Sequence, residues 1–285
     1  SGRYPCLRMV LSTMRQRLIQ WAAGLVTLVS AVLPALAQTP TAAALRADGT
    51  RFALALPDGR MLYSTDLVGA TLHMGNGMAV RIDAVAMVDD LHGKPLWHHQ
   101  LSVANSSGSW HNACTPHSDG TRTAMLVPGR ERGDGTIDHD ATAFAITCTS
   151  GAQGKCLRLG YRPWEASTDR VDPRARYNAC IRMVRADYGG EGRPFTENGK
   201  LIDVFDDARI QVADLSAQQD FEAGWGPAGA VCVRHVRVKN NVTLEQLEAH
   251  YPALRGRVGT VCTEAFARAH GALVFNRSDP SGAAP

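Results

Sequence analysis

The fold turns on residues 172–192, which read DPRARYNACIRMVRADYGGEG. Asp172 followed by Pro173 is typical of a helix N-cap and first helical position. One helical face is marked by apolar residues that recur at i, i+4, i+7 and i+11: Tyr177, Ile181, Val184 and Tyr188. Gly189 and Gly190 predict that the helix ends after Tyr188, because glycine readily adopts the left-handed conformation of a helix stop.

Asp187 is out of place in the last turn of this helix. Backbone carbonyls point outward there, and they disfavour a negative charge by roughly 0.3–1 kcal/mol. Arg182 lies five residues back, too far along a helix to pair with it. We therefore expect Asp187 to accept hydrogen bonds from backbone N–H groups beyond Gly190, or from an arginine elsewhere in the chain such as Arg158 or Arg234.

The first 37 residues read as a secretion signal. A positively charged start precedes an apolar run at 18–33, and residues 35–37, Ala-Leu-Ala, form the small-x-small pattern of a cleavage site. Residues 1–13 do not begin with Met and are interpreted as upstream sequence. A retained anchor over residues 19–36 stays open as the alternative. We expect a secreted or periplasmic protein with no stable membrane insertion after cleavage.

The apparent basicity of the chain belongs to that leader. The whole chain has 30 Lys and Arg against 27 Asp and Glu. Four of the arginines and none of the acids lie in residues 1–37, which leaves 26 basic residues (30 minus 4) against 27 acidic ones, a formal charge of −1. This balance excludes the strongly basic surface of nucleic-acid-binding proteins, so no nucleic-acid partner is expected.

Six cysteines remain once Cys6 in the leader is set aside. An even number after a secretion signal predicts up to three disulfides, for which six cysteines allow 15 pairings. We expect the sequential pairing: Cys114 with Cys148, Cys156 with Cys180, and Cys232 with Cys262. A bond from Cys148 to Cys156, across what reads as a loop, stays open. Each disulfide would contribute roughly 3–4 kcal/mol, so the cysteines are interpreted as staples rather than catalysts.

Strand patterns dominate residues 45–150. Short runs with alternating burial are separated by Gly, Asp and Asn turns, which predicts an antiparallel sandwich or barrel-like half. The expected strands lie at 51–56, 60–64, 71–74, 78–88, 95–103 and 143–149. Residues 38–47 are expected to be a mobile leader and residues 129–140 a polar loop.

Residues 151–275 mix helices and hairpins. Hairpins are expected at 193–206, turning at Asn198-Gly199, and at 221–238. Beyond them the capping box Thr243–Gln246 opens a helix, a short helix is expected at 263–271, and residues 276–285 are expected to form a frayed tail. The sequence thus predicts a β-rich, disulfide-stapled α+β fold whose halves, 45–150 and 151–275, form one compact unit.

Several ordered segments carry a family resemblance: TCTSGAQGKCLRLGYRPW (147–164), ACIRMVRADYGGEG (179–192), TENGKLIDVFD (196–206), IQ (210–211) and FEAGWGPAGAVCVRHVR (221–237). From about Gly49 to Cys262 the chain resembles the bacterial ADYC-domain proteins, which are secreted or lipid-anchored and named for an Ala-Asp-Tyr-Cys motif. The resemblance implies an extracytoplasmic location and the limits of the fold, and it brings no assigned activity.

One departure from the family pattern concerns its name-giving cysteine. The motif here reads Ala186-Asp187-Tyr188-Gly189, with glycine in place of cysteine. If relatives use that cysteine in a disulfide, its partner should be missing here too, and the resemblance places the vacated partner near Tyr251. A cysteine that can be lost is not expected to be a catalytic nucleophile.

The residue spacings give only a weak signal for a metal site. His111, Cys114 and His117 have short spacings that could supply zinc ligands, with His98 or His99 completing the set. Cys114 is needed to keep the disulfide count even, so we favour surface histidines beside a disulfide.

Two further motifs read better as ordinary loops. Asp134, Asp138 and Asp140 could bind calcium but miss the EF-hand spacing, so a solvated loop is favoured. Residues 150–156 lack the first glycine and the Ser/Thr of a phosphate-binding loop. No cofactor is expected.

Two function classes stay open. Asp187, Glu222 and His235 could form a carboxylate–histidine set for glycan or peptide hydrolysis, although such trios are more often buried structural networks. Among the tryptophans that stand beside turns or strand ends, Trp164 and Trp225 are the candidates for stacking on a ligand. We expect a non-catalytic module that binds an envelope glycan or protein, with the hydrolase as the alternative.

Overall fold

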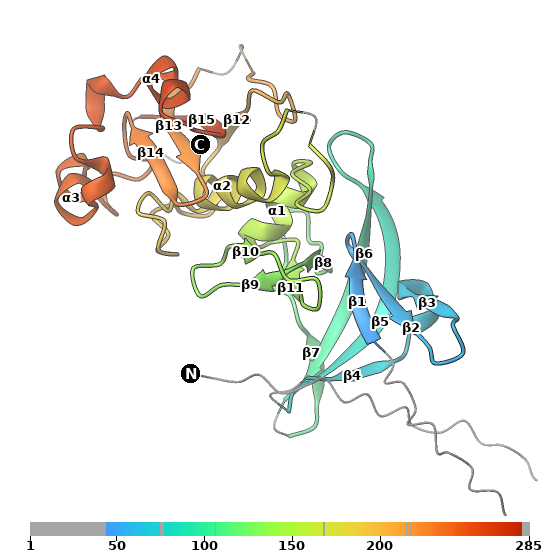
Figure 1. Ribbon diagram of the computed structural model, residues 1–285. Helices are drawn as coiled ribbons and strands as arrows, with labels where there is room; N and C mark the ends of the chain where they lie inside the picture. The colour runs from blue at the N-terminus through green and yellow to red at the C-terminus, as the bar shows by residue number, and fades with distance from the viewer. Residues whose placement is uncertain are drawn as a thin grey trace, which may run out of the picture.

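The computed structural model describes residues 44–280, except residues 75, 76, 106, 168, 215 and 217 (Figure 1). The expected signal segment, residues 1–37, and residues 281–285 lie outside the described residues. Within the described range, no helix is long and apolar enough to cross a membrane.

The N-terminal half is built from two antiparallel sheets. The smaller sheet has the order β1-β2-β3 and the larger the order β11-β8-β6-β5-β4, with β7 beside β6. The bounds are β1 Ala44–Asp48, β2 Arg51–Ala55, β3 Met61–Tyr63, β4 Thr71–His73, β5 Ala79–Asp89, β6 Pro95–Ala104, β7 Trp110–Asn112, β8 Ala124–Pro128 and β11 Phe144–Cys148, with a 3₁₀ turn, η1, at Ser64–Leu67. Phe52 and Leu54 of the smaller sheet share one buried core with Ile82, Leu101 and Leu126 of the larger.

Several elements of this half differ from expectation. Residues 44–47, placed in a mobile leader, belong to β1, which pairs with β2 along its whole length. The predicted polar loop 129–140 holds a short ribbon, β9 (Arg130–Glu131) and β10 (Ile137–Asp138). Strand β8 escaped prediction because Ala124 to Val127 are all buried, and a strand covered on both faces shows no alternation.

The C-terminal half is a four-stranded antiparallel sheet between helices. Its strand order is β12-β15-β13-β14. The bounds are α1 Ala152–Arg158, α2 Pro173–Arg185, β12 Ile202–Phe205, β13 Asp220–Gly226, β14 Gly229–Val233, α3 Leu244–His250, η2 Pro252–Leu254, η3 Gly259–Val261, α4 Glu264–Ala269 and β15 Val274–Ser278. Strand residues alternate between two cores: Val274 faces the core that includes α2, whereas Phe275 faces the core that includes α4. Together with the N-terminal sheets, this confirms a β-rich α+β fold.

Three predictions for this half are wrong. The segment between Cys148 and Cys156 is not a loop, because it begins helix α1. Residues 193–196 form no hairpin strand: the Phe195 N–H donates to the Arg185 carbonyl, 3.1 Å away, and β12 pairs with β15 instead. Residues 276–278 are not a frayed tail, since β15 lies between β12 and β13 in the sheet.

Helix α2 ends three residues earlier than predicted. Its C-cap is Ala186, in the left-handed conformation with φ of 49°, and the helix stops at Arg185. The chain therefore turns before Asp187, which removes this carboxylate from the last helical turn. The left-handed residue is an alanine, and the sequence rule that assigns this role to glycine placed the stop too late.

Three disulfides fix the fold. They join Cys114 to Cys148, Cys156 to Cys180 and Cys232 to Cys262, which is the sequential pairing. Such bonds are typical of proteins that mature in an oxidising compartment.

The two halves share a core. Leu96, Met125 and Val127 of the N-terminal sheets lie in the same buried cluster as Tyr177 and Trp225 of the C-terminal half. The long β5–β6 hairpin reaches across to α1, where the Leu91 N–H donates to the Arg158 carbonyl, 3.1 Å away (Figure 1). The tip of this hairpin therefore forms part of the junction between the halves.

Candidate functional site

Asp187 is buried and fully bonded. Its side chain is 0% exposed and accepts hydrogen bonds from the backbone N–H groups of Gly190, at 3.1 Å, and Gly192, at 2.8 Å. The expected backbone donors are therefore confirmed. The arginine is Arg182, at 2.6 Å, rather than Arg158 or Arg234. The five-residue spacing is too long on a continuous helix, but the left-handed Ala186 turns the chain back so that Asp187 reaches it.

Glu222 is the acceptor of a second buried network. One carboxylate oxygen accepts from Tyr188 Oη at 3.1 Å and from Arg237 Nη2 at 3.0 Å. The other accepts from Arg237 Nε at 3.0 Å and from Asn276 Nδ2 at 2.7 Å. Burial alone would raise the pKa of Glu222, but the charge and hydrogen bonds of Arg237 hold it below its usual range. This carboxylate is ionised and buried, and both of its oxygens accept hydrogen bonds.

His235 lies elsewhere. It is half-buried in a surface pocket of about 460 Å³ with Arg234 and Glu264, and neither Asp187 nor Glu222 lines that pocket. Its ring nitrogens lie 3.3 and 3.4 Å from the backbone carbonyls of Val236 and Asp220. The structure therefore does not bring the predicted carboxylate–histidine set to one open site.

The tryptophans give little support for ligand stacking. Trp225 is 0% exposed, stacks on Tyr188 and donates its indole N–H to Asn276 Oδ1 at 2.8 Å, so its prediction as a stacking platform is wrong. Trp164 is half-buried, packs against the core and lies against Gly49, leaving one edge in a small cleft beside Arg174. Trp164 therefore exposes only part of its ring to this cleft.

Several of the candidate metal ligands already have other partners within the protein. Cys114 is in a disulfide, His117 lies 3.3 Å from Asp119, and His99 bonds Ser64 and the Ala124 carbonyl. Among the residues that the structure describes, no group of three or more His, Cys, Asp or Glu could hold a metal.

The aspartates of the glycine-rich loop pair with arginines: Asp134 with Arg182, Asp138 with Arg132, and Asp140 with Arg130.

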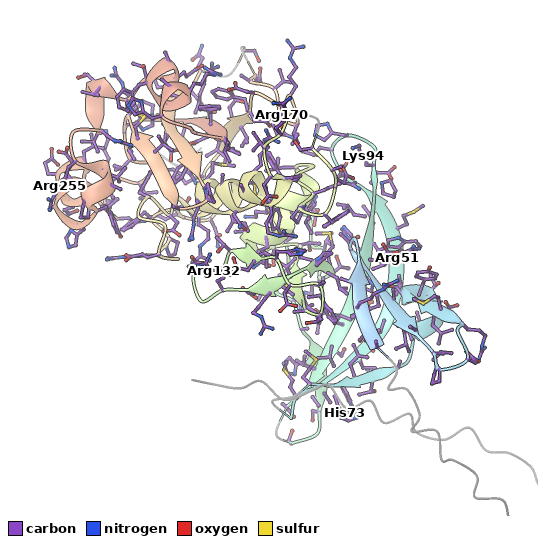
Figure 2. All side chains as sticks on the ribbon, in the orientation of Figure 1. Arg51, His73, Lys94, Arg132, Arg170 and Arg255 are labelled. Carbon is purple, nitrogen blue, oxygen red and sulfur yellow. A yellow bond between two sulfur atoms is a disulfide. The ribbon has the colours of Figure 1, made fainter. Side chains whose placement is uncertain are left out.

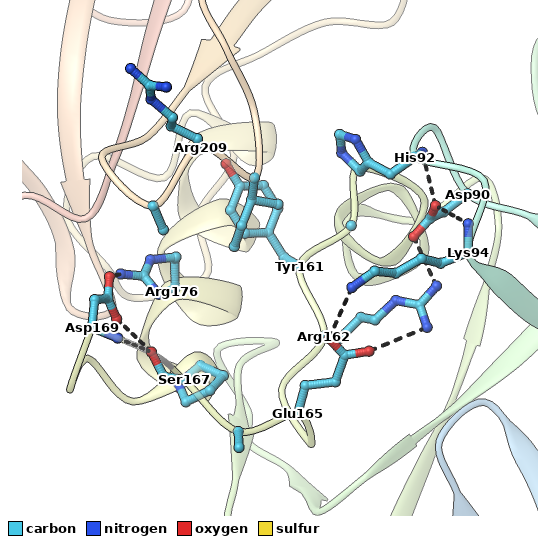
Figure 3. Close-up of a pocket in the computed structure, with 15 residues that line it drawn as sticks. Asp90, His92, Lys94, Tyr161, Arg162, Glu165, Ser167, Asp169, Arg176 and Arg209 are labelled. Carbon is cyan, nitrogen blue, oxygen red and sulfur yellow. Dashed lines mark hydrogen bonds and ion pairs between the residues drawn. The ribbon is translucent and has the colours of Figure 1, made fainter.

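An open pocket of about 320 Å³, here called the junction pocket, lies at the junction of the halves (Figure 3). Four segments line it. They are the β5–β6 turn with Asp90, His92 and Lys94, residues 160–162, 165–167 and 169 after α1, the start of α2 with Arg176, and the loop at 208–210. Ligand sites commonly form where two units of a fold meet.

The covalent and packing framework fixes these walls. The Cys156–Cys180 disulfide ties α1 to α2, one turn beyond Arg176. Gly160 has a φ of +91°, and a Cβ atom there would lie 2.7 Å from the ring of His92, so only glycine allows this approach. The pocket is therefore preorganised rather than a gap between loose loops.

The loop on the opposite wall is anchored by one carboxylate. Asp206 accepts a hydrogen bond from Tyr161 Oη at 2.9 Å and from the N–H groups of Ile210 and Gln211 at 3.2 and 2.8 Å. These bonds fix the loop that carries Arg209 at the pocket rim, and Figure 3 shows the Arg209 guanidinium pointing away from the other lining side chains.

One end of the pocket is electrically balanced. Arg162 Nη2 lies 2.8 Å from Asp90 Oδ2, and Glu165 lies 3.4 Å from Arg162 and 3.5 Å from Lys94. Burial would raise the pKa of Asp90, but its bonds from Arg162 and from two backbone N–H groups hold it below the usual range. Two cations face two carboxylates here.

The other end also holds two cations and two carboxylates. Arg176 pairs with Asp169, whose pKa is lowered to about 2 by the Ser167 hydroxyl and then by Arg176. Arg209 adds a second cation, and the buried Asp206, which bonds Tyr161 and anchors the loop of Arg209, is the second carboxylate. Figure 3 shows the two groups on opposite sides of the pocket.

Two arginines in the wall keep unsatisfied donors. The side chains of Arg162 and Arg176 are only 8% and 7% exposed, and the Nε–H of each is buried without a hydrogen-bond partner. An unpaired buried donor costs roughly 1–3 kcal/mol. Each of these Nε–H groups has almost no accessible surface, so neither is a donor open to a ligand in the pocket.

Comparison with known proteins assigns a family. A family model described as the ADYC domain matches residues 64–239. The chain belongs to the ADYC-domain family. No curated protein and no solved structure matches the chain.

The ADYC motif has a structural role in this domain. Ala186 is the left-handed cap of α2, Asp187 fastens the next turn, and Tyr188 lies between Trp225 and Phe195 while donating to Glu222. Gly189, in place of cysteine, lies directly beneath the ring of Tyr251. The motif organises the core rather than an open site.

Sequence reasoning overlooked the junction pocket. Its walls come from a turn near residue 90 and from segments about 70 to 120 residues later, which only the folded chain brings together. One signal was available: the stretch from Arg162 to Arg176 is dense in charges and is bracketed by a disulfide. Charged side chains on a covalently fixed loop are candidates for ligand contacts.

Proposed function

We propose that this ADYC domain is a non-catalytic binding module of a secreted or periplasmic protein, and that it binds an envelope glycan in the junction pocket. The observation that carries the proposal is an open pocket at the junction of the halves whose lining combines four cations with the partly exposed carboxylates of Glu165 and Asp169.

The lining suits a polyhydroxylated molecule. Sugar hydroxyls both donate and accept, and the pocket offers cationic donors beside carboxylates that remain partly exposed: Glu165 at 42% and Asp169 at 38%. A volume of about 320 Å³ is at the small end of ligand pockets, which fits one or two sugar rings better than a folded protein surface.

The hydrolase alternative lacks support from the geometry. An acid/base pair must reach one reacting centre. Asp187 and Glu222 are both 0% exposed and satisfied by arginines, and His235 lines a different pocket. Their arrangement supports a structural role.

The test is a binding screen of peptidoglycan fragments and other envelope oligosaccharides against protein exported and purified from the full-length chain. Ala166, an exposed wall residue, is changed to Trp to fill the pocket, and Ala249, exposed on α3, is changed to Trp as the matched control. We expect binding that is lost in Ala166→Trp and kept in Ala249→Trp, without release of new reducing ends. Binding unaffected by Ala166→Trp, or cleavage of the bound glycan, would overturn the proposal.

A further inference from the structure

The long β5–β6 hairpin leaves one edge of its sheet open. Strand β5 pairs with β4 only over residues 79–81, and Ile82 bonds residues 69 and 70. Over residues 84–89 the strand pairs with β6 alone, and in the described part of the chain no backbone group bonds its outer side. This stretch is here called the free edge. Figure 2 shows the hairpin extending from the larger sheet to Lys94 near its tip.

The hydrogen bonds of the hairpin decide which residues of the free edge face outward. Trp97, which stands opposite Met87, donates its N–H to Thr50 Oγ1 at 2.6 Å. The Met87–Trp97 pair is therefore not hydrogen-bonded across the hairpin. Because the bonding direction alternates along an antiparallel strand, Val85, Met87 and Asp89 point their N–H and C=O groups away from β6. The free edge thus offers three residues whose backbone groups can pair with a further strand.

The side chains of the free edge are mostly apolar and exposed. Met87 is 61% exposed and Val88 is 44% exposed. Soluble proteins commonly protect a sheet edge with lysine, proline or a very short strand. Residues 84–88 read AVAMV and carry no charge, and the only charge of the free edge is Asp89 at its end. An edge of this kind is a template for the addition of a strand.

We infer that the free edge pairs with the free edge of a second copy of this chain, antiparallel and centred on Met87. In such a pair, outward-facing residues stand opposite one another. The symmetric register places Met87 opposite the second copy's Met87, and Val85 opposite the second copy's Asp89. It also covers Val88 with the second copy's Ala86. The contact is two-fold and closes after two copies.

The symmetric register suits the side chains that it brings together. Met87 neighbours Trp97 on β6, so pairing extends this contact into a continuous apolar row of two tryptophans and two methionines. A second copy supplies the row by symmetry, whereas a foreign strand would need an apolar side chain at the same position. The two Asp89 side chains stand at opposite ends, roughly 13 Å apart along the strands and beyond the screening length of about 8 Å. Asp83, the acid before the free edge, is paired with Arg81.

The contact is small, so the dimer is expected only at high protein concentration. Three hydrogen-bonded residue pairs on one edge belong to the class of weak, transient interfaces. This inference does not rest on the proposed function, because residues 84–89 do not line the junction pocket.

The experiment is sedimentation velocity of the exported, purified protein over about a hundredfold range of concentration that reaches about 1 mM. We expect the sedimentation coefficient of the wild type to rise toward that of a dimer. Met87→Lys should stay monomeric, because two like charges would stand opposite each other. The control is Leu201→Lys, which places the same charge on a similarly exposed apolar residue, 66% exposed, and should associate like the wild type.

A charge swap tests the register itself. Met87→Lys and Met87→Glu should each be monomeric alone, and their equimolar mixture should associate again, because position 87 stands opposite itself. Urea midpoints close to that of the wild type check that the variants are folded. A wild type that is monomeric throughout, association that survives Met87→Lys, or a mixture that stays monomeric would each overturn the inference and leave the proposed function standing.

Discussion

The ring of Tyr251 occupies the space that a side chain at position 189 would need: a Cβ atom on Gly189 would lie 2.1 Å from Tyr251 Cε1. Position 189 is where relatives of the ADYC type have the cysteine of their motif, and the residues around Tyr251 are where its lost partner was expected. The two positions are neighbours in space. A glycine and an aromatic ring fill the place where two cysteines could meet.

The first prediction restores that pair. The double variant Gly189→Cys/Tyr251→Cys should form a fourth disulfide, because the structure places the two positions in contact. Closing a loop of about 60 residues would stabilise the fold by up to about 4 kcal/mol. Peptide mapping without reductant and the urea midpoint measure the two effects. Free thiols at both positions in the folded protein would show that the backbones at 189 and 251 are not placed for a disulfide.

The second prediction concerns the buried carboxylate at the centre of the C-terminal half. Glu222→Gln leaves Arg237, 2% exposed, without its counter-ion, and should lower the free energy of unfolding by about 3–5 kcal/mol. The control is Asp207→Asn, which removes one partner of the exposed Arg268–Asp207 pair and should cost no more than about 1 kcal/mol. Equal effects in urea unfolding would contradict the account.

The third prediction follows from a buried histidine in the N-terminal half. Burial lowers the pKa of His99 to about 4, and its neutral ring is held between the Ser64 hydroxyl and the Ala124 carbonyl. An unfolded histidine titrates near 6.5, so between these values only the unfolded chain takes up the proton. Stability present at neutral pH is therefore lost as the pH falls from about 6.5 to 4, by up to about 3 kcal/mol.

The measurement is the free energy of unfolding in urea at pH 7 and at pH 4.5. His99→Gln, which keeps hydrogen-bonding capacity without the titration, should flatten the dependence on pH. A wild-type profile that is already flat over this range would refute the histidine assignment.

The fourth prediction links a disulfide to the pocket. Cys156→Ser/Cys180→Ser frees α1 from α2 and should cost about 3 kcal/mol, from a loop of 24 residues. Because both helices support walls of the junction pocket, ligand affinity should fall as well, even where the variant remains folded. The control, Cys232→Ser/Cys262→Ser, removes a staple from the α4 side of the sheet and should lower stability with little effect on binding. Equal losses of affinity would argue against a pocket positioned by the first disulfide.

Some features could be predicted from local rules, and others could not. The hairpins of the N-terminal half and the capping box at Thr243 follow from patterns within a few residues. The even number of cysteines predicts disulfides but allows 15 pairings, and the structure has the sequential pairing that we expected. The end of α2 could not be placed, because an alanine rather than a glycine takes the left-handed cap. Strand β15 was missed because its polar Asn276 is buried only through Glu222 and Trp225, which lie about 50 residues away in sequence.

The candidate site, too, could be predicted from the sequence only in part. The conflict at Asp187 correctly signalled a specific partner, yet the partner is structural, and Arg182 reaches it only because of the unforeseen turn at Ala186. The junction pocket depends on the tip of the β5–β6 hairpin meeting α1, a long-range contact with no local signature. A high density of charged residues beside a disulfide is the sequence feature that best indicates the junction pocket.

The most direct test of the central claim is an NMR titration of the labelled, exported protein with the best-binding envelope glycan. The account predicts that the largest backbone shift changes cluster in the β5–β6 turn at 90–94, in 160–169 and in 206–211, with none around His235. Shift changes centred on the pocket of His235 and Glu264, or spread over the surface without a cluster at the junction, would contradict it.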